Sequence, residues 1–225
     1  MLSFLNKYGY NVHSQNGEDG ILAEALGRLG YEASRLPDED GVTIDVARRV
    51  GYSVEIGGND GQWMSNTRLL IDHGWSGLFV ESDYDLYLKC KENWEHNPKV
   101  KAQCARVDEN NVNAFVDGRC DLLSLDTDGS DYRIFAGLKA KPKIVILEID
   151  SSLLPNDPSF NRDGAAGYFR GVELGLEKGY FLLCHTGNLI FVDEQYKHLF
   201  PEVNKHPLID SEFYFNRGWI KENAA

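Results

Sequence analysis

The stretch VEIGGNDG, residues Val54–Gly61, forms a glycine-rich, acidic turn directly after an apolar run. Gly57 and Gly58 allow a tight turn and a close approach of the backbone to a ligand. Glu81 ends the next apolar run, 20 residues after Gly61, where an acidic side chain can accept hydrogen bonds from ribose hydroxyls. The pattern predicts a strand–turn–helix that binds a nucleotide-like cofactor. A purely structural turn is the alternative.

The chemistry of this turn favours one class of cofactor over another. A dinucleotide site needs G-x-G-x-x-G, but Asn59 occupies the position of the second glycine. The carboxylates of Glu55 and Asp60 would repel a pyrophosphate, whereas they suit a ligand with a sulfonium and an ammonium group. The phosphate-binding pattern G-x-x-x-x-G-K-[ST] does not occur in the sequence.

Apolar runs alternate with helical patterns on both sides of the turn. We expect strands at 52–56, 77–81, 100–105, 122–125, 144–149, 180–184 and 189–192, and helices at 18–29, 66–72, 83–93, 110–116, 132–138 and 168–178. This order predicts an α/β fold with a Rossmann-like, doubly wound, mostly parallel sheet and a C-terminal antiparallel hairpin. Ligands of such sheets bind at the carboxyl ends of the strands.

The composition fits a single domain and narrows the range of partners. We divide residues 1–225 into an N-terminal helical cap or lid (1–50), a core with its hairpin (51–193) and a C-terminal extension (194–225), with residues 31–49 as a polar, acidic connection. A net charge of -12 argues against nucleic acid. No apolar run is long enough for a signal peptide or a membrane span, and four scattered cysteines suit a reducing, cytoplasmic location.

Carboxylates gather after two later strands. Asp126, Asp128 and Asp131 follow the strand at 122–125, and Glu148 closes the strand at 144–149. Oxygen ligands from neighbouring strand ends are what Mg²⁺ or another hard divalent ion needs, and such an ion could lower the pKa of a substrate hydroxyl. Alternatively, these acids bind an amino group of the cofactor, or act as a general base without a metal.

These motifs together resemble those of FkbM-like methyltransferases, a branch of the class I S-adenosylmethionine-dependent methyltransferases. The resemblance rests on the acidic glycine turn, the strand ending in Glu81, the segment SLDTDG at 124–129 and the strand ending in Glu148, in that order. The segment SQNGEDG at 14–20 resembles a signature of a related branch. The family's usual lysine is replaced by Ser124 and its usual glutamate by Asp128, which leaves the substrate open.

The resemblance implies a cofactor and a role for each matching residue. Glu55, Gly57, Asp60 and Gly61 would border the methionine moiety of S-adenosylmethionine. Glu81 would hold the ribose, and Asp126 would face the amino group or the reacting centre. Macrolide sugar methyltransferases of the TylF type use magnesium bound by aspartates near these strand ends, which supports Asp126, Asp128 and Glu148 as metal ligands.

The amino-terminal signature has two interpretations. Ser14 or Asn16 could cap the first helix, with Glu18 and Asp19 favourable in its first turn. Alternatively, Gln15, Glu18 and Asp19 fold over the cofactor as a lid, with Gln15 and Glu18 as binding residues.

Two later segments complete the candidate site. The long connection at 151–167 is expected to bind substrate or act as a lid. His185 lies near a strand end, and we interpret it as a core residue rather than a base.

The sequence therefore predicts an S-adenosylmethionine-dependent enzyme that methylates an oxygen of a small polar acceptor, such as a sugar, a nucleotide sugar or a secondary metabolite. The catalytic candidates are Asp126, Asp128 and Glu148. A non-catalytic cofactor-binding module and an NAD-dependent oxidoreductase are the alternatives. An exposed sheet edge would suit a homodimer.

Overall fold

A computed structural model describes residues 4–31 and 50–215 of the chain. Most of the acidic connection expected at 31–49, and the end of the C-terminal extension, therefore lie outside the described residues. The described parts of the three predicted segments pack on one sheet, because α1 contacts β6 and the segment after β7 returns to β6 and β7.

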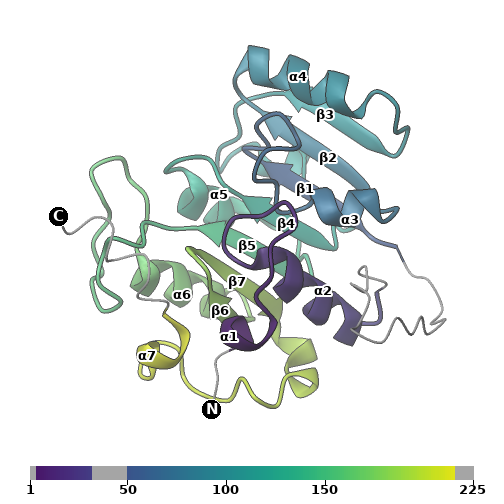
Figure 1. Ribbon diagram of the computed structural model, residues 1–225. Helices are drawn as coiled ribbons and strands as arrows, with labels where there is room; N and C mark the ends of the chain where they lie inside the picture. The colour runs from purple at the N-terminus through teal and green to yellow at the C-terminus, as the bar shows by residue number, and fades with distance from the viewer. Residues whose placement is uncertain (1–3, 32–49, 216–225) are drawn as a thin grey trace.

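A single twisted sheet organises the described residues (Figure 1). Its strand order is β3-β2-β1-β4-β5-β7-β6; β7 runs antiparallel to its two neighbours, β5 and β6, and every other pair of neighbouring strands is parallel. The strands are β1 (Tyr52–Ile56), β2 (Ser76–Glu81), β3 (Val100–Cys104), β4 (Leu122–Leu125), β5 (Ile144–Glu148), β6 (Tyr180–His185) and β7 (Asn188–Asp193). This arrangement confirms the predicted fold class, a Rossmann-like, mostly parallel sheet with a C-terminal antiparallel hairpin.

Helices flank the sheet on the connections between strands. They are α1 (Phe4–Tyr8), α2 (Glu18–Arg28), α3 (Arg68–Asp72), α4 (Tyr84–Trp94), α5 (Asp131–Gly137), α6 (Tyr168–Glu177) and α7 (Ser211–Tyr214), with 3₁₀ turns η1 (Val112–Ala114) and η2 (Glu194–Leu199). The expected helix at 110–116 is therefore only a 3₁₀ turn. We did not predict α1, α7 or η2, because elements this short carry too few residues to show a helical period.

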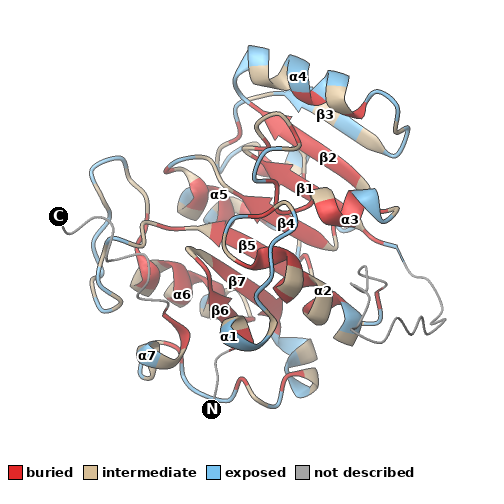
Figure 2. Ribbon diagram, in the orientation of Figure 1, coloured by how far each residue is buried: buried red, intermediate tan, exposed pale blue. Residues whose placement is uncertain are grey.

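The core lies along the central strands, whose residues are buried almost throughout (Figure 2). Strands buried on both faces read as continuous apolar runs, and β4 and β5 have this character. The edge strand β3 differs, since its burial is partial and it carries Lys101 and Gln103 on its exposed positions. The sheet thus has an exposed edge at β3, which the sequence analysis did not locate; the homodimer itself stays a prediction.

Gly57 holds the ends of β1 and β4 together. Its φ is +81°, a left-handed conformation that favours glycine. A Cβ atom placed there would lie 1.6 Å from the carbonyl oxygen of Asp126. Glycine at this position therefore lets the turn after β1 touch the acidic turn after β4.

No helix in the described ranges 4–31 and 50–215 is both long and apolar enough to cross a bilayer.

Candidate functional site

Two adjoining cavities lie at the carboxyl ends of the parallel strands. The first, which we call the glycine-loop cavity, has a volume of about 560 Å³ and is lined by residues from the turn after β1, the end of β2 and the segment after β3. The second, the acidic cavity, has a volume of about 550 Å³ and is lined by residues from the ends of β4 and β5 and the loop that follows. Four residues line both cavities: Gln15, Met64, Asp126 and Asp128.

The backbone N–H groups of the glycine turn donate hydrogen bonds to acceptors within the protein. Gly57 and Gly58 donate to the carbonyl oxygen of Val80, at 2.9 and 3.3 Å. The next N–H, that of Asn59, donates to the carboxylate of Glu81 at 2.9 Å. The Asp60 N–H donates to the Asn59 side chain at 2.7 Å. A pyrophosphate cradle needs N–H groups that point at the ligand, and these four already have partners.

Glu81 lies between the glycine turn and the start of α4. Besides the Asn59 bond, its carboxylate accepts a hydrogen bond from the Asp83 N–H at 2.8 Å, and the side chain is 9% exposed. Asp83 in turn caps α4, because its side chain accepts from the N–H groups of Asp85 and Leu86. Both acids line the glycine-loop cavity. Glu81 is thus fixed at the position that the sequence predicted for a ribose contact.

The Glu55 carboxylate has a structural partner of its own. It accepts hydrogen bonds from Ser65 Oγ at 2.7 Å, Thr67 Oγ1 at 2.5 Å and the Asn66 N–H at 3.1 Å. Burial raises its pKa to about 6, against the lowering effect of these hydrogen bonds. Glu55 lines the glycine-loop cavity, but these contacts direct its carboxylate to the segment before α3.

Asp60 and Gly61 line neither cavity. The Asp60 carboxylate accepts from the N–H groups of Gln62 and Trp63, at 2.9 and 2.7 Å, and so closes the turn. A Cβ atom at Gly61 would lie 2.7 Å from Trp94 Nε1, because the turn packs tightly on α4. Of the residues expected beside the methionine moiety, Glu55 and Gly57 are therefore on the cavity wall, and Asp60 and Gly61 shape the turn behind it.

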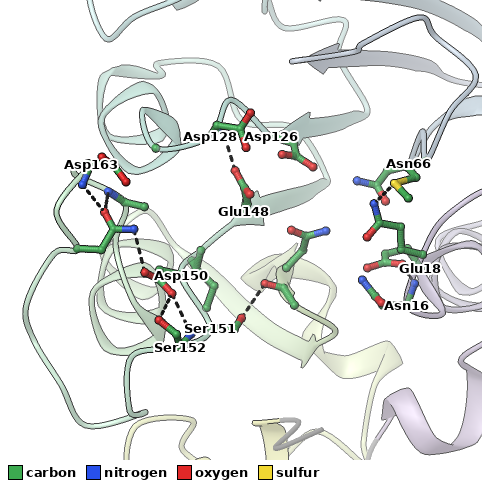
Figure 3. Close-up of a pocket in the computed structure, with 18 residues that line it drawn as sticks. Asn16, Glu18, Asn66, Asp126, Asp128, Glu148, Asp150, Ser151, Ser152 and Asp163 are labelled. Atoms are coloured by element: carbon green, nitrogen blue, oxygen red, sulfur yellow. Dashed lines mark hydrogen bonds between the residues drawn. The ribbon is translucent and has the colours of Figure 1, made fainter. Parts of the chain in front are cut away.

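Asp126, Asp128 and Glu148 come together as predicted (Figure 3). One carboxylate oxygen of each lies within 4.8 Å of the others, and the Asp128 N–H donates to Glu148 at 3.1 Å. Burial and then the neighbouring charge of Asp126 raise the pKa of Glu148, and burial likewise raises the pKa of Asp126. Three carboxylates at this spacing fit the oxygen donors that a hard divalent ion takes.

The amino-terminal signature makes hydrogen bonds at the start of α2. Ser14 Oγ accepts from the Asp19 N–H at 3.0 Å, while the Asp19 carboxylate accepts from the N–H groups of Ser14, His13 and Val12. The N-cap residue of α2 is Gly17, which makes no side-chain cap bond, so Ser14 does not occupy the predicted cap position, although its Oγ accepts from an N–H group of the first turn. Asn16 does not cap the helix; its N–H donates to Glu18.

The same segment also reaches the site. Glu18 is 1% exposed and accepts a hydrogen bond from Thr186 Oγ1 at 2.6 Å, which ties the start of α2 to the turn between β6 and β7. Gln15 lines both cavities, and its side-chain amide contacts the Met64 sulfur. Of the two residues predicted to bind the cofactor, Gln15 therefore lines both cavities, whereas Glu18 lines the acidic cavity alone; the lid role stays a prediction.

Strained backbone marks residues that the sequence did not reveal. Outside glycine, the described residues with positive φ are Asn59, Met64 and Asp128, at 51°, 57° and 56°. All three line a cavity, and such strain concentrates at functional sites. Met64 and its neighbour Asn66, whose amide donates to Ser124 Oγ at 3.1 Å, are additions to the predicted site. A backbone angle leaves no mark in sequence, so Met64 offered no signal.

His185 belongs to the core, as interpreted from sequence. It is 0% exposed and stacks on Phe215, with ring centroids 4.5 Å apart. Burial lowers its pKa to about 3, so the ring is neutral at physiological pH. Its Nε2 lies 2.8 Å from Ser151 Oγ.

Comparison with known proteins gives similarity in structure alone. No family model and no curated protein matches the sequence. Among solved structures, the chain is similar to the bifunctional kinase-methyltransferase WbdD, with 18% identity and a TM-score of 0.46 over 77% of this chain and 36% of that one. It is also similar to the CurJ carbon methyltransferase, with 15% identity and a TM-score of 0.43 over 64% of this chain and 48% of that one. The chain thus spans well under half the length of the WbdD chains that it matches.

Proposed function

We propose that this chain is an S-adenosylmethionine-dependent methyltransferase that acts on an oxygen of a small polar acceptor. The observation that carries the proposal is the pair of cavities that meet at Asp126 and Asp128. One cavity has the walls of a nucleoside site, and the other has the acids and amides of a polar substrate site. A transfer reaction needs its two substrates to meet at one point, and the shared residues define that point.

The hydrogen bonds of the glycine turn favour this cofactor over NAD. Because the N–H groups of residues 57–60 are all engaged within the protein, the turn has none to offer a pyrophosphate. The carboxylates of Glu81, Asp83 and Asp126 add negative charge to the same cavity, where Arg106 is the one basic side chain among the described lining residues. Such a wall suits the positive sulfonium and ammonium groups of S-adenosylmethionine and opposes a dinucleotide.

Each residue of the two walls then has a task. S-adenosylmethionine, when bound, supplies an electrophilic methyl group. Glu81 would hold the ribose hydroxyls, and the close backbone at Gly57 would border the methionine part. Gln15 would cover the point where the cavities meet. Asp126, Asp128 and Glu148 would hold the acceptor hydroxyl and take its proton, directly or with a divalent ion as a shared ligand.

Calorimetry and a turnover assay test the proposal together. We expect S-adenosylhomocysteine to release or absorb heat on binding, and NAD to give none; the reverse result would favour the oxidoreductase. Formation of S-adenosylhomocysteine with a panel of hydroxylated acceptors then separates an enzyme from a non-catalytic module. Repeating the turnover with a chelator, and then with added Mg²⁺, decides whether the three acids act with an ion or without one.

The cysteines support a cytoplasmic setting for the proposed reaction. All four are free, and three of them are buried. Free thiols suit a reducing compartment such as the cytoplasm.

A further inference from the structure

The acidic cavity has one sign of charge on its walls. Six carboxyl groups line it: Glu18, Asp126, Asp128, Glu148, Asp150 and Asp163. Among the described residues, no lysine, arginine or histidine lines this cavity. Arg170, in the first turn of α6, pairs instead with Glu173 at 2.8 Å and donates to the carbonyl oxygen of Pro158. An anionic substrate would thus meet no positive partner on these walls.

The negative charge does not depend on the three candidate metal ligands. In Figure 3, Asp150 and Asp163 are drawn apart from Asp126 and Asp128, on the loop that follows β5. The Asp150 carboxylate accepts from Ser152 Oγ at 2.5 Å and from Asn161 Nδ2 at 2.8 Å. An ion bound at Asp126 would therefore leave a separate acidic wall in place.

Asn161 joins the two acids of that wall. Its side-chain oxygen accepts from the Asp163 N–H at 2.9 Å, while its amide group donates to Asp150 at 2.8 Å. The loop is further closed by the Ala165 N–H, which donates to the same oxygen at 2.9 Å. Asp150 and Asp163, which we call the acidic wall, are thus held in place by hydrogen bonds within the loop after β5.

The remaining polar lining suits hydroxyl groups. Side-chain amides and hydroxyls, which both donate and accept, complete the walls: Gln15, Asn16, Asn66, Ser151, Ser152, Asn161 and Asn188. No aromatic residue in the described ranges lines the acidic cavity, so a flat ring has no face to stack on. The volume of about 550 Å³ is that of a site for one small molecule.

We propose that the methyl acceptor is a small, hydroxyl-rich molecule that carries a protonated amine, such as an amino sugar or an aminocyclitol. The ammonium group would bind the wall of Asp150 and Asp163, and the amides would bind the hydroxyls. This inference rests on the proposed function for the identity of the cavity as an acceptor site. It disfavours a nucleotide sugar, one of the acceptors expected from the sequence, because the charged side chains among the described lining residues are all carboxylates and would repel two phosphates.

Matched pairs of ligands test the charge requirement. Calorimetry on the protein saturated with S-adenosylhomocysteine compares glucosamine with glucose and with N-acetylglucosamine, and 2-deoxystreptamine with an uncharged cyclitol. We expect each amine to bind at least tenfold more tightly than its neutral counterparts, with the difference shrinking at high salt. If no amine binds more tightly than its counterpart, or if a uridine diphosphate sugar binds best, the inference is overturned.

Variants then locate the charge. Asp163→Asn and Asp150→Asn should each weaken glucosamine binding by about tenfold, since each removes one charge next to the ligand. Glu177→Gln, on an exposed position of α6 outside both cavities, is the matched control and should change nothing. An unchanged affinity in Asp163→Asn, whose side chain is exposed and makes no packing contribution to the core, would contradict the placement.

The two proposals fail separately. Binding of S-adenosylhomocysteine is measured first, on the unmodified chain and on every variant. If the unmodified chain does not bind it, the methyltransferase proposal is overturned. Glucosamine binding is then repeated without cofactor, so that the charge of the cavity is tested in either case. Unchanged cofactor affinity and melting temperature in the variants show that the fold is intact.

Discussion

Gly57→Ala and Gly27→Ala are the same chemical change, and the structure assigns them opposite effects. Gly57 has a φ of +81°, and an added Cβ would lie 1.6 Å from the carbonyl oxygen of Asp126. Gly27 lies in the last turn of α2, and an added Cβ would meet no atom within 4 Å. The pair therefore separates the local conformational demand of the glycine turn from the general effect of adding a methyl group.

The magnitudes follow from the contacts that must change. A left-handed backbone costs alanine about 1–2 kcal/mol. To clear the Asp126 oxygen, the turn must also weaken the bonds from Gly57 N to Val80 and from Asp126 N to Ile56, now 2.9 and 3.0 Å, at about 1 kcal/mol each. We expect Gly57→Ala to lower the free energy of unfolding by roughly 3–4 kcal/mol. Gly27→Ala should raise it by about 0.5–1 kcal/mol, because alanine loses less entropy in a helix.

Urea unfolding and calorimetry measure the two consequences. The turn displaced by Gly57→Ala borders the proposed cofactor site, so S-adenosylhomocysteine should bind on the order of 100-fold more weakly, while Gly27→Ala should leave binding unchanged. If Gly57→Ala lowers the free energy of unfolding by less than about 1 kcal/mol, or if the variant binds S-adenosylhomocysteine normally, the close contact between the turns after β1 and β4 is refuted.

Three further substitutions test single residues. Glu81→Gln should weaken S-adenosylhomocysteine binding about tenfold in calorimetry, since a charged hydrogen bond to the ribose is lost; normal affinity would remove Glu81 from the site. Gln15→Ala should weaken the same binding with little change in melting temperature, whereas a fall in melting temperature with normal affinity would make Gln15 a structural residue only. His185 has a pKa of about 3 in the fold and 6.5 when unfolded, so the unfolded chain binds a proton first and stability falls as pH drops from 6.5 toward 3. Urea unfolding therefore measures how much the free energy of unfolding falls between pH 6.5 and pH 5. This fall should be about 2 kcal/mol larger in the unmodified chain than in His185→Gln, and equal falls in the two proteins would contradict a buried neutral ring.

The elements that the sequence predicted share a local signal. Strands such as β4 and β5 are apolar throughout because both faces are buried, and their ends are marked by the acids that follow. The grouping of Asp126, Asp128 and Glu148 was predictable for the same reason, since the carboxyl ends of neighbouring parallel strands meet at one edge of the sheet. Sequence order and sheet geometry are enough for this part of the site.

The parts that could not be predicted depend on contacts between distant residues. Whether the Glu55 carboxylate enters the cavity or binds residues 65–67 depends on how the folded chain places the segment before α3 beside the end of β1. Glu18 and Thr186 are 168 positions apart, and no periodicity announces their hydrogen bond. The left-handed backbone of Met64 is likewise imposed by the surrounding chain, and methionine has no preference for it.

Because the two cavities share four residues, the binding of a ligand in one cavity can be coupled to the binding of a ligand in the other. Gln15, Met64, Asp126 and Asp128 belong to both walls, so a ligand that orders them for one cavity prepares them for the other. Linkage then requires reciprocity: whatever factor the cofactor adds to the affinity for the acceptor, the acceptor must add to the affinity for the cofactor. With the proposed donor and acceptor in the two cavities, the shared residues, Asp126 among them, would be a point of cooperativity at which each ligand favours the binding of the other.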